Sequence, residues 1–230
     1  MADGGEPPAG VAAILFDIDG TLISTGGASD RAWRRAFAEL HGIDVEVGDY
    51  TGKGVTDPAV GLTSFRGALG REPERDEMAK LMDLRLRYLP EEVATSPGYR
   101  VLPGVEALLE RLRREERLFG LITGNVEEAA RIKLARAGLD RFFAFGAYGS
   151  DATERVDVVR RALERADELT GGRLDRAGTI ALGDTPVDVQ AGHGAGIRVV
   201  GVATGDYGVE QLREAGADAV VSDLTQPLPI

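Results

Sequence analysis

The sequence contains no cysteine and only two histidines, His41 and His193. Without cysteine there are no disulfides, no thiolate nucleophile and no cysteine-bound zinc. Two histidines are too few for a multi-histidine zinc site. These absences exclude several common kinds of structural and catalytic centre.

Long apolar runs are absent as well. None approaches the roughly 18–20 residues that a membrane-spanning helix needs. The first ten residues, MADGGEPPAG, lack the basic start and apolar core of a secretory signal, and we expect residues 1–10 to form a flexible tail. These features favour a cytoplasmic location.

Basic residues are fewer than acidic ones, and the net charge is −11. This excess disfavours non-specific binding to nucleic acid or to an anionic membrane, because both need a basic face. It is compatible with a phosphorylated small molecule if a bound cation or local donors offset the negative field. We therefore expect a small-molecule partner, no nucleic acid and no membrane. The sequence does not distinguish a monomer from a dimer.

The 230 residues suit one large domain or a core with a smaller insert. Short apolar runs, typical of buried strands, cover residues 11–17, 117–125, 142–150, 178–184, 197–205 and 218–224. Amphipathic stretches between them predict helices at residues 103–115, 126–138, 154–169, 185–196 and 209–217. This alternation predicts an α/β fold with a parallel sheet and right-handed crossovers.

Residues 24–98 interrupt the alternation with helices only, which are expected at residues 29–42, 56–70 and 73–95. In the second of these, Asp57 is expected at the N-cap and Pro58 at the first helical position. We interpret this stretch as an inserted helical subdomain with hinges near residues 22–26 and 95–101.

Three of the predicted strands end in polar residues that could meet at one edge of the sheet. These ends are Asp17-Ile18-Asp19-Gly20-Thr21, Thr123-Gly124-Asn125, and Gly183-Asp184-Thr185-Pro186 followed by Asp188. Taken singly, the second and third are also typical of turns and helix caps. The first is not, because two close carboxylates repel each other and need a cation, a shared proton or firm hydrogen bonds.

Together the three strand ends predict a divalent cation site. The carboxylates of Asp17 and Asp184, with a backbone carbonyl near Asp19 and some waters, would form an all-oxygen shell. Asp188 would lie within reach of a metal-bound water. Hard oxygen ligands with retained waters favour Mg²⁺.

The three motifs, DIDGT at residues 17–21, LITGN at 121–125 and GDTPVD at 183–188, resemble those of the haloacid dehalogenase-like hydrolases. The resemblance implies a Rossmann-like three-layer core formed by residues 11–23 and 99–230. It also implies an α-helical cap, residues 24–98, that closes over the site. The expected activity is that of a Mg²⁺-dependent phosphomonoesterase of the phosphoglycolate-phosphatase-like group, acting on a small phosphorylated metabolite.

The resemblance also implies individual roles. Asp17 would be the nucleophile that forms an aspartyl-phosphate, and Asp19 would be the general acid and base. Thr123, Gly124 and Asn125, together with Gly20, would hold the phosphate. An aspartate at position 19 favours phosphate esters, because dehalogenases and phosphonoacetaldehyde hydrolases lack it. Two alternatives are a phosphomutase of the β-phosphoglucomutase kind, which shares these carboxylates, and a catalytically silent phosphate-binding module.

The family's third motif is usually a lysine, yet no lysine follows Lys133 in this chain. Arg155, at the start of a predicted helix, is the best positional match, and we expect it to supply the cation. Lys133 is the rival. It lies two turns into a helix, where we expect a surface cation well removed from the chemistry.

In the helical insert, Gly54-Val55-Thr56-Asp57 resembles the family's substrate loop. This implies that Thr56 contacts the substrate. Family members often carry a cation where Val55 stands, and we expect Lys53 to substitute for it. An alternative is that this stretch is only the start of a helix.

Overall fold

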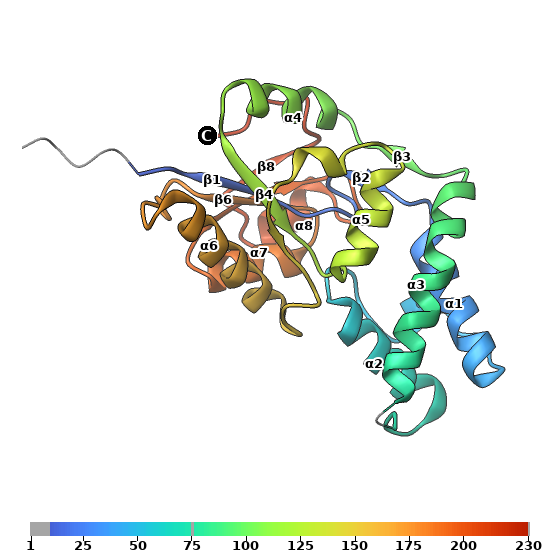
Figure 1. Ribbon diagram of the computed structural model, residues 1–230. Coiled ribbons are helices and arrows are strands. Elements are labelled where there is room, and N and C mark those ends of the chain that lie inside the picture. The colour runs from blue at the N-terminus through green and yellow to red at the C-terminus, as the bar shows by residue number, and fades with distance from the viewer. Residues whose placement is uncertain (1–9, 75, 230) are drawn as a thin grey trace, which may run out of the picture.

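The computed structural model describes residues 10–74 and 76–229, so residues 1–9 of the predicted tail lie outside the described part (Figure 1). Its centre is a parallel sheet with the strand order β5-β4-β1-β6-β7-β8. The strands are β1 (Ala13–Phe16), β4 (Leu118–Ile122), β5 (Gly146–Ala147), β6 (Ile180–Gly183), β7 (Arg198–Val202) and β8 (Ala219–Val221). Each lies within a run that was predicted to be a strand.

Strand β1 shows why these runs are apolar throughout. Ile14 and Phe16 belong to the core cluster on one face of the sheet, whereas Ala13 and Leu15 belong to the cluster on the other. Successive side chains of a strand point to opposite faces, so a strand covered on both sides needs apolar residues at every position. All four residues are buried.

Helices cover both faces of the sheet and complete a three-layer core. Residues of α4 (Val105–Arg114) and α5 (Glu127–Ala135) pack in the cluster with Ile14. Residues of α6 (Arg155–Thr170) and α7 (Pro186–Gly194) pack in the cluster with Leu15. Helix α8 (Val209–Glu214) contacts β7 and β8. The predicted α/β, Rossmann-like fold is therefore confirmed.

The inserted segment is helical, as predicted, and has an apolar core of its own. It contains α1 (Ala28–His41), a short 3-10 helix η1 (Val47–Asp49), α2 (Asp57–Leu69) and α3 (Glu77–Thr95). In Figure 1 these helices stand to one side of the sheet. Their shared core includes Trp33, Phe37, Phe65, Leu81 and Leu84. Within the described residues no helix has both the length and the apolar character to cross a membrane.

The insert joins the core through two short antiparallel strands that the sequence did not predict, β2 (Ile23–Ser24) and β3 (Arg100–Val101). They lie at the places where the chain leaves and re-enters the core. Gly26 and Gly98 pass so closely that a Cβ on Gly26 would lie 2.4 Å from the carbonyl carbon of Gly98. The two connecting segments therefore run side by side near the predicted hinges.

Candidate active site

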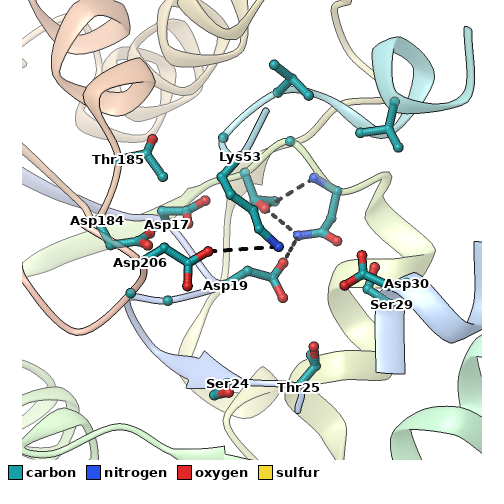
Figure 2. Close-up of a pocket in the computed structure, with 18 of the residues that line it drawn as sticks. Asp17, Asp19, Ser24, Thr25, Ser29, Asp30, Lys53, Asp184, Thr185 and Asp206 are labelled. Carbon is teal, nitrogen blue, oxygen red and sulfur yellow. Dashed lines mark hydrogen bonds and ion pairs between the residues drawn. The ribbon is translucent and has the colours of Figure 1, made fainter. Parts of the chain in front are cut away.

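The three polar strand ends meet at the carboxyl edge of the sheet, where Figure 2 shows Asp17, Asp19 and Asp184 close together. They line a cavity of about 400 Å³ whose other walls come from the insert. Strands β1, β4 and β6 are neighbours in the sheet, so the residues that follow them are brought together. The structure thus places the predicted motifs at one site.

Three buried carboxylates form the centre of this site. Oxygens of Asp17, Asp184 and Asp188 all lie within 4.8 Å of one another. Asp17 follows β1 and Asp184 follows β6, whereas Asp188 lies in the first turn of α7. Thr185 caps α7 in a reciprocal capping box with Asp188. Asp184 is therefore not needed as a helix cap, and its carboxylate turns to the cavity.

Glycines on two loops allow Asp184 to sit where it does. A Cβ on Gly205 would lie 1.7 Å from Oδ2 of Asp184, and a Cβ on Gly20 would lie 2.2 Å from it. Gly20 also has a φ of 85°, which favours glycine. Gly20 thus leaves room for the Asp184 carboxylate beside it, and its expected role in holding the phosphate stays a prediction.

Arg155, the first residue of α6, neutralises part of the cluster. Its Nη2 donates to Oδ1 of Asp17 at 2.6 Å and to Oδ1 of Asp188 at 2.7 Å. The other oxygen of Asp188 accepts from the backbone N–H (3.1 Å) and the hydroxyl (2.7 Å) of Thr185. Both oxygens of Asp188 are thus held by the protein, and Asp17 and Asp184 are left as the better placed ligands for a metal.

One guanidinium does not balance three buried carboxylates, and the pKa values show this. Burial raises the pKa of Asp17 to about 7; Arg155 opposes this rise and Asp188 adds to it. Burial, followed by the charges of Asp17 and Asp188, raises the pKa of Asp184 to about 9. A divalent cation between oxygen ligands would remove this excess of negative charge. The cluster therefore fits a divalent metal, with Asp17 and Asp184 as its carboxylate ligands.

This imbalance predicts how Asp184→Asn changes stability. Because the pKa of Asp184 is raised from 3.8 to about 9 on folding, the folded state retains this proton while the unfolded state has lost it. The contribution of Asp184 to the free energy of unfolding is fully present below the unfolded pKa of 3.8, and it is lost progressively as the pH rises toward about 9. Without metal, Asp184→Asn should therefore have a higher Tm than the wild type, by a margin that grows with pH.

Thermal melts in EDTA and in Mg²⁺ across this pH range measure both parts of the expectation. Added Mg²⁺ should raise the Tm of the wild type and have little effect on Asp184→Asn, because the variant lacks a ligand. A difference in Tm between the two proteins that did not change with pH would contradict the assigned titration of Asp184. An equal response to Mg²⁺ would remove Asp184 from the metal site.

Asp19 occupies a different environment from Asp17, two residues away. Its Oδ2 accepts from Nζ of Lys133 and from Nδ2 of Asn125, both at 2.7 Å. Burial tends to raise the pKa of Asp19, but the charge of Lys133 and the hydrogen bonds from Asn125 and Lys133 outweigh it and lower the pKa below its ordinary value. The two aspartates are thus held by separate cations, Arg155 and Lys133.

The expectation that Lys133 is a surface cation was wrong. Its side chain is only 2% exposed, and its Nζ also donates to Oδ1 of Asn125 at 2.6 Å. Lys133 lies on the buried face of α5, and side chains of a helix lean toward its N-terminus. The Thr123–Asn125 turn leads into that end of α5, so a long side chain two turns along the helix returns to the site.

The turn after β4 joins the two halves of the site. Oγ1 of Thr123 accepts from Nδ2 of Asn125 at 2.8 Å and from its backbone N–H at 3.2 Å. This arrangement orients the hydroxyl hydrogen of Thr123 away from Asn125. Thr123, Gly124 and Asn125 all line the cavity, so the turn is placed to hold an anion there.

Thr56 and Asp57 are placed differently from what was expected, whereas Lys53 does line the cavity. Thr56 is fully buried, its hydroxyl donates to the carbonyl of Thr153 at 2.7 Å, and it is not among the residues that line the cavity. Thr56, not Asp57, is the N-cap of α2, because its Oγ1 accepts from the N–H of Ala59. Lys53 lies on the exposed rim, with its Nζ 4.0 Å from Oδ2 of Asp206.

Sequence reasoning missed several residues that line the cavity from the insert and from the loop after β7. They are Ser29, Asp30, Trp33, Asp57 and Asp206. The motif at residues 54–57 drew attention to Asp57, but only as a helix cap. The others carry no local pattern that separates them from ordinary helix or loop residues.

Known proteins resemble this chain along most of its length. A family model described as haloacid dehalogenase-like hydrolase matches residues 11–196. Phosphoglycolate phosphatase of Rhodospirillum rubrum is 31% identical over 221 residues, which cover 92% of this chain and 87% of the relative. The 2-deoxyglucose-6-phosphate phosphatase 2 of Saccharomyces cerevisiae is 28% identical over 236 residues, which cover 96% of this chain and 91% of the relative.

A solved structure supports the fold. CbbY from Rhodobacter sphaeroides, in complex with phosphate, superposes with a TM-score of 0.74 at 23% identity, over 94% of this chain and 96% of that chain. The likeness includes the insert as well as the sheet, because nearly all of both chains is covered. At this identity the likeness supports the fold alone.

Proposed function

The chain belongs to the haloacid dehalogenase-like hydrolase family, and on this basis we propose that it is a Mg²⁺-dependent phosphomonoesterase that works through an aspartyl-phosphate at Asp17. The observation that carries the proposal is the pairing of Asp17 with Arg155 and of Asp19 with Lys133 at the edge of one cavity. Two carboxylates with different partners can take different roles, one as nucleophile and one as acid and base.

In the first step an Asp17 oxygen attacks phosphorus, and the bond from phosphorus to the ester oxygen breaks. Asp19 gives its proton to that leaving oxygen. In the second step Asp19 takes a proton from water, whose oxygen attacks phosphorus and releases inorganic phosphate and free Asp17. Arg155 orients the attacking oxygen of Asp17 throughout, and the Thr123 hydroxyl donates to a phosphate oxygen.

The metal and Lys133 set the charges that these steps need. Mg²⁺ held by Asp17 and Asp184 would supply positive charge beside the phosphate and favour the ionised form of Asp17. Asp19 must be protonated before the first step, although Lys133 and Asn125 keep its pKa low in the free site. A phosphate dianion beside Asp19 raises that pKa by repulsion and shares the charge of Lys133.

We propose that residues 24–98 act as a cap that excludes water during the first step. Two features support this role. The insert has its own apolar core, so it can move as a unit. The chain leaves and re-enters the core at the β2 and β3 segments, and these two connections lie side by side.

The walls of the cavity favour a hydroxylated leaving group of the sugar type. Of the cations that line the cavity, Lys133 and Arg155 are bonded to carboxylates, whereas Lys53 and Arg100 are exposed. Figure 2 shows Ser29 and Asp30 across the cavity from Asp184. A carboxylate at that wall can accept hydrogen bonds from hydroxyls, whereas it repels an acid such as phosphoglycolate.

Asp30→Ala tests this substrate class. The wild type should prefer glucose 6-phosphate to phosphoglycolate, and the variant should lose roughly 10- to 150-fold in kcat/KM for the sugar, since a hydrogen bond to a charged group contributes about 1.5–3 kcal/mol. Its activity on p-nitrophenyl phosphate should change little. Asp49→Ala, an exposed insert residue outside the cavity, is the matched control. Preference of the wild type for phosphoglycolate would contradict the proposal that the substrate is a sugar phosphate.

The activity itself is tested with p-nitrophenyl phosphate, with and without Mg²⁺ and with EDTA. Turnover that depends on Mg²⁺ supports the phosphatase. If no phosphate ester is turned over, the catalytically silent phosphate-binding module is favoured instead. A phosphomutase would convert a sugar phosphate to an isomer instead of releasing phosphate. The relatives identified by sequence are phosphatases, which favours release of phosphate.

A further inference from the structure

A buried ion pair inside the insert has no part in the steps above. Nη2 of Arg85 donates to Oδ1 of Asp57 at 2.9 Å, and Nη1 lies 2.8 Å from Oδ2. Arg85 is fully buried on α3, and the guanidinium lies over the ring of Trp33 at 5.0 Å. Burying two charges is costly, and here Nε and Nη1 of Arg85 make no hydrogen bond among the described residues, so the pair depends on the carboxylate of Asp57.

Asp57 also binds the core, on both sides of Asn125. Its backbone N–H donates to the carbonyl of Gly124 at 2.7 Å. Its Oδ2 accepts from the backbone N–H of Val126 at 2.8 Å. Asp57 therefore holds both neighbours of Asn125. Asn125 in turn forms hydrogen bonds with Asp19 and Lys133.

The backbones of the insert and of the core pack closely around these contacts. A Cβ on Gly124 would lie 2.3 Å from the carbonyl oxygen of Val55, and a Cβ on Gly149 would lie 2.1 Å from that of Gly124. The hydroxyl of Thr56 adds a further bond to the core at Thr153. The insert is thus seated directly on the Thr123–Asn125 turn, which we propose holds the phosphate.

We propose that Asp57 is a positioning residue, and that the Asp57–Arg85 pair couples docking of the insert to the arrangement of Asn125. The proposal rests on the proposed phosphatase function. When the insert is docked, Asp57 fixes Gly124 and Val126, so Asn125 and Lys133 hold Asp19 in place for proton transfer. When the insert lifts, both contacts to the core are lost together, while Arg85 keeps the carboxylate of Asp57 oriented for docking again.

Asp57→Asn should lower kcat for p-nitrophenyl phosphate by roughly 10- to 100-fold, because a small displacement of a catalytic group can cost that much in rate. KM should change far less, since this small substrate is held through its phosphate. The control is Arg87→Gln on α3, the helix that carries Arg85; it removes the exposed ion pair with Glu39 and should leave kcat unchanged.

The double variant Asp57→Asn/Arg85→Gln separates positioning from stability. Asp57→Asn alone leaves Arg85 buried without a counter-charge and should lower the Tm, whereas the double variant removes both charges and should recover it. We expect kcat to stay low in the double variant, because the carboxylate that orders the turn is still missing. Recovery of kcat together with Tm would overturn the proposal and make the pair a purely structural one.

Trypsin cleavage after Lys53 gives a readout that does not depend on activity. Lys53 is exposed on the docked loop, and looser docking should speed cleavage there in Asp57→Asn and in the double variant, several-fold over the wild type and Arg87→Gln. Equal cleavage rates in all four proteins would also overturn the proposal. A wild type that hydrolyses no phosphate ester would instead overturn the proposed function, and proteolysis would still decide whether Asp57 seats the insert.

Discussion

Asp17→Asn should abolish turnover of p-nitrophenyl phosphate in saturating Mg²⁺. The amide is a poor nucleophile, so no aspartyl-phosphate can form, and it is also a weaker metal ligand than a carboxylate. The neighbouring groups cannot substitute for it. Asp188 is held by Arg155 and Thr185, and Asp19 is held by Lys133 and Asn125. Initial rates of phosphate release, followed to the detection limit, measure the effect.

The variant should fold as well as the wild type. An asparagine at position 17 has the same shape and can still accept from Arg155 through its amide oxygen, in place of the present 2.6 Å bond. It also removes a carboxylate whose pKa burial raises to about 7. The Tm in EDTA at neutral pH should therefore not fall. If the variant kept more than a few per cent of the wild-type rate, an aspartyl-phosphate at Asp17 would be the wrong mechanism.

The fold and the centre of the site could be predicted because they depend on local patterns. Apolar runs such as Ala13–Phe16 identify strands buried on both faces, and the amphipathic stretches between them leave little choice but a parallel sheet. In such a sheet the strand ends converge, so Asp17, Thr123 and Asp184 could be placed at one edge from the sequence alone. That step needed only a parallel sheet, whereas the order that makes β4, β1 and β6 neighbours came from the structure.

Features that depend on three-dimensional packing could not be predicted in the same way. The β2–β3 pair brings together segments more than seventy residues apart through backbone contacts that have no side-chain pattern. Whether Thr56 or Asp57 caps α2 depends on the docking of Asp57 against Val126, which draws its carboxylate away from its own helix. Asp30 and Trp33 face the cavity only because the insert lies over it.

Lys133 is the most instructive of these cases, because its burial changes the effect on kcat that we expect when the residue is replaced. Its distance along α5 from the motif suggested a role on the surface. The rotation of the helix instead buries the side chain and aims its Nζ at Asp19 and Asn125. A position in sequence fixes which turn of a helix a residue occupies, whereas its face is fixed by how that helix packs on the sheet.

Lys133→Met should therefore lower kcat by roughly 30- to 1,000-fold, the effect of losing on the order of 2–4 kcal/mol of electrostatic stabilisation. Methionine retains the length and apolar stem of lysine, so packing beneath the turn is preserved, and the Tm should fall only by the contribution of the ion pair with the partly exposed Asp19. What is lost is the charge that holds Asp19 and that, in the proposed mechanism, lies beside the phosphoryl group. The measurement is kcat for p-nitrophenyl phosphate at saturating Mg²⁺.

Arg131→Met is the matched control, because Arg131 lies two residues earlier on the same helix, is 67% exposed and pairs only with Glu127 among the described residues. An exposed pair of this kind contributes little, so kcat and Tm should both stay close to the wild type. If Lys133→Met also stayed within about threefold of the wild type, Asn125 alone would suffice to orient Asp19. Arg155 would then be the one buried cation on which the proposed chemistry depends, since no other described cation contacts Asp17.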